Sequence, residues 1–218
     1  MTGTGDPSGP AAGDAPAADV ELLARALHHP DGAVRDRAAR ALGDRRDPNA
    51  IPALVAAVRD GRGGRGAVWA LTQFHDPRLV APLAGALADG DATARALAAG
   101  KLADLCDRAA VPALVAALED SEAHVREEVT RALGRLGDPA ALEPLLHALR
   151  ADPGDHVREA AATAVGTLGG ADPRAVHALR AACDDRHVMV RRAAAEALDA
   201  PRATFPAAPA PAREVPKT

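Results

Sequence analysis

Residues 138–169 read DPAALEPLLHALRADPGDHVREAAATAVGTLG, and residues 111–138, directly before them, read VPALVAALEDSEAHVREEVTRALGRLGD. Each stretch holds two short segments in which apolar residues recur at intervals of three or four positions. Apolar side chains at that spacing lie on one face of an α-helix. Each stretch therefore predicts a pair of amphipathic helices joined by a short polar loop.

The same two-helix pattern recurs along most of the chain. Its clearest marker is an apolar residue near the end of each second helix, and successive markers are 29, 31, 31, 32 and 33 residues apart. The six marker residues are Leu42, Leu71, Leu102, Leu133, Val165 and Leu198. One amphipathic pair cannot bury its apolar face alone, whereas stacked pairs bury a continuous core. We therefore expect an all-α solenoid, an α-α superhelix of six helical hairpins, over residues 19–200.

Helix boundary signals support this expectation. Aspartate is a good helix cap and proline suits the first helical turn, and the two residues occur together before four of the predicted first helices. These dipeptides are Asp47-Pro48, Asp76-Pro77, Asp138-Pro139 and Asp172-Pro173. Gly43, Gly137 and Gly169 follow the predicted second helices, where a left-handed C-cap favours glycine.

The repeat in residues 111–169 resembles the HEAT repeats, specifically the short bacterial subtype first described in phycobilisome lyases. The resemblance extends over all six units. It implies an armadillo-like helical solenoid. It implies little about activity, because that family includes lyases, scaffolds and uncharacterised proteins.

The composition agrees with a helical protein. The chain has 218 residues, of which 48% are hydrophobic and only 1% aromatic. Alanine, at about a quarter of the residues, is the strongest helix former, whereas β-sandwiches and barrels depend on aromatic and β-branched residues. The net charge is −4, so the basic excess that is typical of nucleic-acid binders is missing. All basic residues are arginines except Lys101 and Lys217.

The two ends of the chain lack the repeat. Residues 1–18 are rich in Gly, Pro and Ala, and residues 201–218 are rich in Pro, so we expect both segments to be disordered. The sequence contains no secretory signal and no apolar stretch of membrane-spanning length, and its 2 cysteines are too few for a disulfide framework. We therefore expect a cytoplasmic protein, and the sequence leaves its oligomeric state open.

An aspartate and an arginine recur near the start of five predicted second helices. Because the pair recurs with the fold, we expect a structural ladder in which each aspartate caps a helix and meets its arginine, rather than a row of phosphate-binding arginines. The pairs are Asp31/Arg35, Asp91/Arg95, Asp120/Arg126, Asp155/Arg158 and Asp185/Arg191.

The single tryptophan, Trp69, marks the predicted binding site. Second helices line the concave face of HEAT-type solenoids, so Trp69 and the nearby Leu97 are expected to lie there among arginines. An aromatic and an aliphatic anchor surrounded by arginines are typical of a protein-binding hot spot. Alternatively, Trp69 only fills space left by the glycines of residues 63–66. The predicted arginines are Arg37, Arg40, Arg62, Arg65 and Arg131.

No residue pattern predicts a metal, cofactor or catalytic site. His124 and His156 occupy equivalent places in adjacent units, which are too far apart to share one ion. HEAT-like hydroxylases of the deoxyhypusine type carry His-Glu pairs, and this chain contains no such dipeptide. Cys106 has no evident base partner. GRGGRG, residues 61–66, follows a predicted helix, whereas the dinucleotide fingerprint needs a preceding strand.

Three functions remain open from the sequence. The favoured hypothesis is a non-enzymatic scaffold that binds a peptide or a partner protein on the concave face. The second, implied by the resemblance, is a lyase-like protein that handles a bilin-like chromophore, whose propionates would pair with arginines and whose rings would stack on Trp69. The third is nucleic-acid binding, as in HEAT-like alkyl-base glycosylases, which the net charge disfavours.

Overall fold

The computed structural model describes residues 14–170 and 172–200. Within these ranges the chain forms twelve α-helices and no strand. The first helix begins at Asp14, so the predicted boundary at residue 18 falls inside it. The rest of the predicted N-terminal segment and the whole proline-rich tail, residues 201–218, lie outside the described residues.

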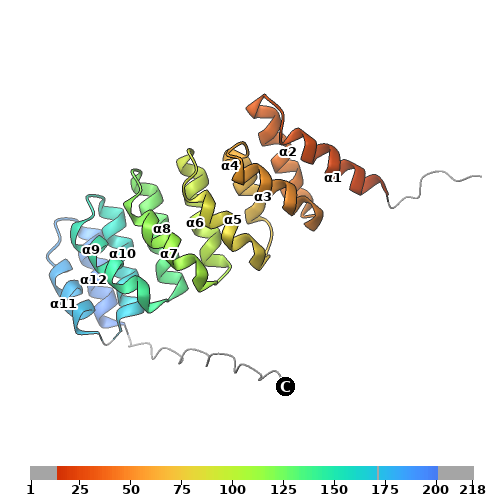
Figure 1. The fold of residues 1–218 in the computed structure, drawn as a ribbon. Helices are drawn as coiled ribbons and strands as arrows, with labels where there is room; N and C mark the ends of the chain where they lie inside the picture. The colour runs from red at the N-terminus through yellow and green to blue at the C-terminus, as the bar shows by residue number, and fades with distance from the viewer. Residues whose placement is uncertain (1–13, 171, 201–218) are drawn as a thin grey trace, which may run out of the picture.

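The twelve helices form six consecutive pairs, which confirms the predicted solenoid. Figure 1 shows the pairs following one another along a curved row from α1 to α12. The pairs are α1 (Asp14–Ala26) and α2 (Gly32–Arg45), α3 (Ile51–Arg59) and α4 (Gly64–Thr72), α5 (Val80–Ala86) and α6 (Ala92–Asp104), α7 (Val111–Ala116) and α8 (Ala123–Leu136), α9 (Leu142–Ala151) and α10 (Asp155–Gly169), and α11 (Pro173–Ala182) and α12 (Val188–Asp199).

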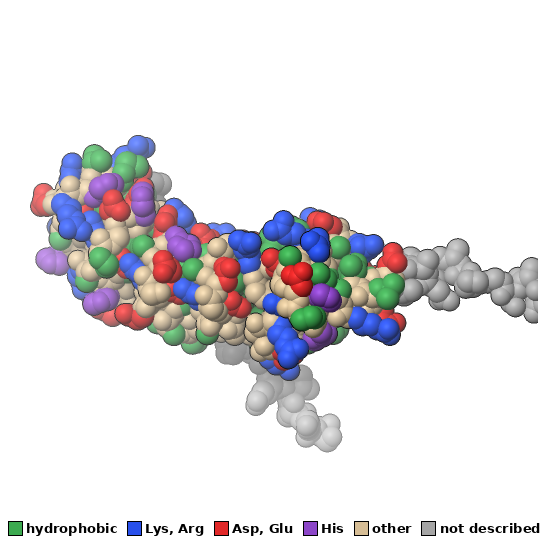
Figure 2. Space-filling view, turned by 90° about the horizontal axis from the view of Figure 1, so that it is seen from above, with side chains coloured by type: hydrophobic (Ala, Val, Ile, Leu, Met, Phe, Trp, Pro, Cys, Tyr) green, Lys and Arg blue, Asp and Glu red, His purple; other side chains and the backbone are tan. Residues whose placement is uncertain are grey.

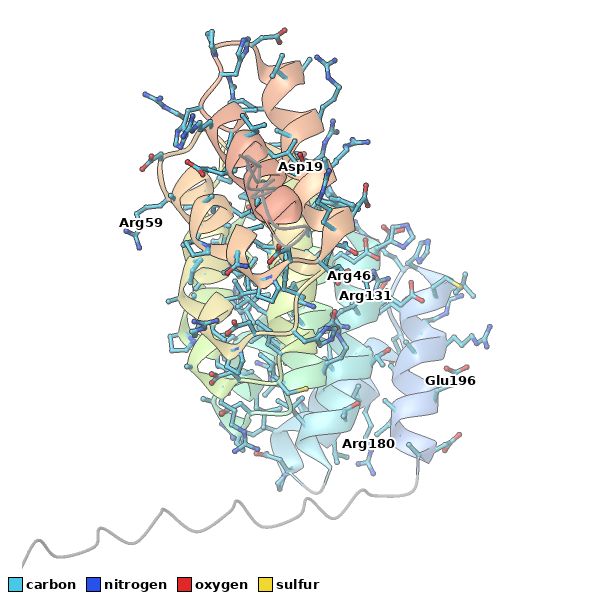
Figure 3. All side chains as sticks on the ribbon, turned by 90° about the vertical axis from the view of Figure 1, so that its right-hand side faces the viewer. Asp19, Arg46, Arg59, Arg131, Arg180 and Glu196 are labelled. Atoms are coloured by element: carbon cyan, nitrogen blue, oxygen red, sulfur yellow. The ribbon has the colours of Figure 1, made fainter. Side chains whose placement is uncertain are left out.

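The second helices of the pairs form the inner layer of the row. They contact one another much more extensively than the first helices do, so the row curves toward them. Figure 3 shows Arg46, Arg131 and Glu196, from the second helices and their ends, on one side of the molecule, and Arg59 of α3 on the other. Five of the six marker residues are fully buried between the layers. Leu198, in the last helix, is half-buried, since no further pair covers it.

Small residues set the spacing of the inner layer. At each junction between neighbouring second helices, the residue that follows the marker residue of one helix faces the residue that precedes the marker residue of the next. At three of these junctions the first of the two residues is a glycine and the second is an alanine. These contacts are Gly43 with Ala70, Gly134 with Ala164 and Gly166 with Ala197. A Cβ atom on Gly134 would lie 2.8 Å from the Ala164 Cβ, which leaves no room for a methyl group. We call this row of contacts the seam.

The seam changes at one junction. Between α6 and α8 its two positions carry Ala103 and Ala132, which are both buried. Between α4 and α6 they carry Thr72 and Lys101, and this junction has the least extensive contact of any between neighbouring second helices. The inner layer therefore departs from its own repeat at Lys101.

The predicted helix caps are largely confirmed. In each of the four Asp-Pro dipeptides, the aspartate side chain accepts a hydrogen bond from the backbone N–H two residues later. Gly137 is the left-handed cap of α8, with φ of 63°. The same prediction is wrong for Gly43, which lies inside α2 at the seam, and the left-handed residue after α2 is Arg46. It is also wrong for Gly169, the last residue of α10, which lies against Ala175.

A matched pair of glycine substitutions tests the seam. Gly134→Ala places a methyl group against Ala164, whereas a Cβ atom on Gly85, an exposed helical residue of α5, would meet nothing within 4 Å. Both substitutions gain the same helix propensity, so we expect Gly85→Ala to raise the unfolding free energy. The unfolding free energy of Gly134→Ala should be about 2 kcal/mol lower than that of Gly85→Ala because of overpacking. Thermal and urea unfolding measure both variants. Equal stabilities would contradict the proposed role of the seam.

Candidate functional site

Three arginines tie neighbouring repeats together through largely buried ion pairs. The Nε–Oδ2 distances are 2.6 Å for Arg95 and Asp120, 2.8 Å for Arg126 and Asp152, and 2.9 Å for Arg158 and Asp185. Each arginine also donates to a backbone carbonyl in the loop of its own repeat. One side chain thus holds two successive loops in register.

This arrangement corrects the predicted ladder. The arginine pairs with the aspartate of the following repeat, not with that of its own. Asp155 is not a member, because its carboxylate contacts His187 Nε2 at 2.9 Å, and Asp152 takes the ladder position. Asp31 and Asp91 cap α2 and α6 as predicted.

The first and last predicted arginines of the ladder bind backbone only. Arg35 donates from Nε to the carbonyl of Arg62 and from Nη1 to those of His29 and Pro30. Arg191 donates to the carbonyls of Asp185 and Arg186. The ion-paired ladder therefore joins the last four repeats, and the first two repeats are connected by a weaker backbone contact.

The ladder can be tested through one carboxylate. The hydrogen bond from Arg95 holds the pKa of Asp120 below its ordinary value. We expect Asp120→Asn to cost about 3 kcal/mol of unfolding free energy at pH 7, since it leaves a buried arginine without its charge partner. Glu21→Gln removes an exposed pair with Arg25 and should cost little.

The pH dependence follows from the direction of this shift. The pKa of the Asp120 carboxyl is lower in the folded state than in the unfolded state, where it is about 3.9. Its stabilising effect is therefore complete above about pH 4 and is lost as the pH falls through the folded value. Urea unfolding at pH 7 and at a series of pH values below 4 measures the difference in unfolding free energy between wild type and Asp120→Asn. A difference that persists unchanged at the lowest pH would contradict the assignment.

The inner face carries three hollows that follow one another. The first, of about 520 Å³, lies between α4, α6 and α8 and is called the central hollow here. The second, of about 470 Å³, lies between α8 and α10 and shares Arg131 with the first. The third, of about 490 Å³, lies against α10, α11 and α12 and shares Thr163 and Thr167 with the second. Each hollow thus shares lining residues with the next, and we call the row of three hollows from α4 to α12 the inner groove.

The structure brings only part of the predicted binding cluster together. Leu97 and Arg131 line the central hollow. Trp69 is half-buried, and its ring lies over Gly43 of α2, so close that a Cβ atom there would be 3.0 Å from Cζ3. The tryptophan thus covers a seam glycine, not residues 63–66.

The arginines of the predicted cluster fall into two groups. Arg131 pairs with Glu127 and Glu128 of its own helix. The other four are exposed, and in the described part of the chain their side chains form no ion pair and line none of the three hollows. These residues are Arg37, Arg40, Arg62 and Arg65.

Lys101 is the residue of this site that the sequence analysis missed. It lines the central hollow from the seam position of α6, and only 4% of its surface is exposed. In the described part of the chain, no carboxylate forms an ion pair with its ammonium group and no hydrogen bond reaches it. Burial lowers the pKa of Lys101, and the positive charge of Arg46 lowers it further, against the opposing charge of Asp104. The sequence signal that could have revealed this residue is a lysine directly before the marker residue, where the other second helices carry alanine.

Removing this charge should stabilise the fold. Lys101→Met keeps the volume of the side chain and removes the cost of partly desolvating an ammonium group that has no ion pair, so we expect the unfolding free energy to rise by about 1 kcal/mol. Arg131→Met, at an exposed and ion-paired cation of the same hollow, is the control and should give no gain. Urea unfolding at pH 7 measures both variants, and a loss of stability in Lys101→Met would contradict the burial argument.

The described residues include no group of three or more His, Cys, Asp or Glu side chains placed to hold a metal ion. Cys106 is exposed and Cys183 half-buried. No helix within residues 14–170 and 172–200 is both long and apolar enough to cross a membrane.

Comparison with known proteins agrees with the geometry. The family model for HEAT repeats matches residues 11–72 and 80–166. The chain belongs to the HEAT-repeat family. A second family model, for the PBS lyase HEAT-like repeat, matches residues 157–185 of this HEAT-repeat protein.

Individual relatives include enzymes. Gallus gallus deoxyhypusine hydroxylase is 36% identical over 104 residues, which are 47% of this chain and 34% of that protein. The HEAT-repeat protein thus spans about a third of the length of this curated relative. The complex of CpcE and CpcF of phycocyanin lyase from Nostoc sp. PCC7120 has a TM-score of 0.58 and 26% identity, over 90% of this chain and 80% of that chain. An engineered protein, 20% identical over 83% of this chain and 95% of its own, has a TM-score of 0.57 and shares the fold.

Proposed function

We propose that this HEAT-repeat protein is a non-enzymatic scaffold that binds a peptide or an extended segment of a partner protein along the inner groove. The continuity of the three hollows carries this proposal. An extended ligand makes contacts along its length, and concave solenoid surfaces are suited to such ligands. The rigid inner layer presents the groove without a large conformational cost.

The anchors of the partner would lie at the N-terminal end of the groove. Leu97 lines the central hollow, and the half-buried Trp69 lies one helix earlier on the same layer. Aromatic and aliphatic side chains at such a place supply much of the binding energy in protein interfaces.

The charge distribution would orient the partner. Residues 35–65 contain eight arginines and four aspartates, whereas residues 119–128 carry five acidic residues and one arginine. Figure 2 shows arginine side chains gathered over the N-terminal repeats, at the right of the view. Complementary charges of this kind raise association rates and fix the direction of a bound segment.

A second candidate function is the handling of a bilin-like chromophore. The match of residues 157–185 to the PBS lyase HEAT-like repeat, and the likeness to the phycocyanin lyase structure, favour it. Exposed arginines would pair with the propionates of such a ligand. Visible absorbance of the purified protein after incubation with a bilin tests this alternative.

Two variants, one in the inner groove and one at the proposed anchor beside it, test the scaffold proposal. Thr163→Arg puts a long side chain into a groove position shared by two hollows, and Trp69→Ala removes the proposed anchor. We expect each to weaken capture of the natural partner from lysate by about tenfold or more, as for a hot-spot residue. Leu22→Arg, at an exposed leucine of α1 outside the groove, is the matched control and should capture it like the wild type.

Circular dichroism confirms that each variant is folded. Capture of the same partner by wild type, Thr163→Arg and Trp69→Ala in equal amounts would overturn the inner-groove proposal. Recovery of a bilin in place of a protein would favour the chromophore alternative.

A further inference from the structure

Lys101 occupies a place where the repeat otherwise puts a small residue. The equivalent residues of the other second helices from α4 onward are alanines. Three of them pack directly on a glycine of the previous helix, where a Cβ atom added to the glycine would lie less than 3 Å from the alanine. At Lys101 the facing residue is Thr72, and the two helices are in looser contact. At this junction the close helix contact is therefore missing, and an amine lies beside the central hollow in its place.

The charges around Lys101 leave its amine without a partner. The carboxylates that line the hollow each pair with an arginine: Asp104 with Arg135, and Glu127 and Glu128 with Arg131. Arg46, beyond the end of α2, adds a further positive charge, and His124 completes the titratable groups of the lining. Burial acts on this amine in the direction that activates a lysine as a nucleophile, Asp104 opposes it, and Arg46 adds to it with a smaller effect than that of Asp104.

We infer that Lys101 is a nucleophilic amine that forms an imine with a small aldehyde or an unhindered ketone entering the central hollow. The hollow, at about 520 Å³, has room for a small organic ligand. Leu97 and Ala96 supply apolar lining for the body of that ligand. The central hollow is also the N-terminal end of the inner groove, so a small carbonyl compound and a partner segment would compete for it, although the inference does not rest on the proposed function.

The reaction needs no reagent beyond the carbonyl compound. The lone pair of the neutral Nζ attacks the carbonyl carbon, a C–N bond forms, and the carbonyl electron pair moves to oxygen, which takes up a proton. The resulting carbinolamine is protonated on its hydroxyl group and loses water, while nitrogen gives up a proton and the C=N bond forms. Amine and carbonyl thus yield imine and water, with no change of oxidation state. The hollow opens to solvent, which exchanges these protons.

The full-length protein supplies its own reference for a test, since Lys217 is the only other lysine. Arg180→Lys adds a second reference, an exposed lysine on the folded part of the chain. Each protein is incubated at pH 7 with butanal and sodium cyanoborohydride, which reduces an imine to a stable secondary amine. Peptide mapping by mass spectrometry then gives the rate of modification at every lysine. It also distinguishes modified lysines from modification of the N-terminal α-amino group.

We expect Lys101 to be modified severalfold faster than the lysine introduced by Arg180→Lys, because a lowered pKa leaves more of the Lys101 amine neutral at pH 7. The half-point of its labelling in a pH series should lie below that of the lysine introduced by Arg180→Lys. Lys101→Arg should abolish incorporation at that peptide and leave the rate at Lys217 unchanged. Modification of Lys101 no faster than the references, or no modification at all, would overturn the inference.

Discussion

The close approach of neighbouring second helices is the constraint on which the rest of the structure depends. Gly134 against Ala164 leaves no space for even one further methyl group, so the inner helices lie closer together than the outer ones. That difference in spacing curves the row of repeats and creates the inner face. The hollows of the groove lie along the same helices. The seam therefore determines both the curvature of the row of repeats and the position of the inner groove.

The ladder of ion pairs acts beside the seam. Arg126 binds the loop of its own repeat and Asp152 of the next, so the repeats are joined at their loops as well as along their helices. Because these pairs are buried and each arginine satisfies two loops, they specify the register between repeats. The first two repeats lack the ion pair, since Arg35 reaches only backbone carbonyls, and the connection there depends on packing and on the hydrogen bond from Arg35 to the Arg62 carbonyl.

Much of the fold could be predicted from the sequence, because the apolar pattern recurs six times and the Asp-Pro cap four times, and both are local signals. The pairing of the ladder could not, since Arg95 and Asp120 meet only when two repeats are stacked. The position of Trp69 over Gly43 and the burial of Lys101 are likewise properties of the junction between helices. Spacing along one helix predicts a face, but it does not show what lies against that face in the next repeat.

Lys101 is where this protein departs most from its own repeat, and the charge state of that lysine is the most direct measure of what the departure does. With only two lysines in the chain, ¹³C-lysine labelling gives two sets of NMR signals that can be followed through a pH titration. Lys101 should titrate below the ordinary lysine value of about 10.4. Titration of Lys101 at the ordinary value would show that its ammonium group is well solvated, and would contradict the burial of this side chain at the central hollow.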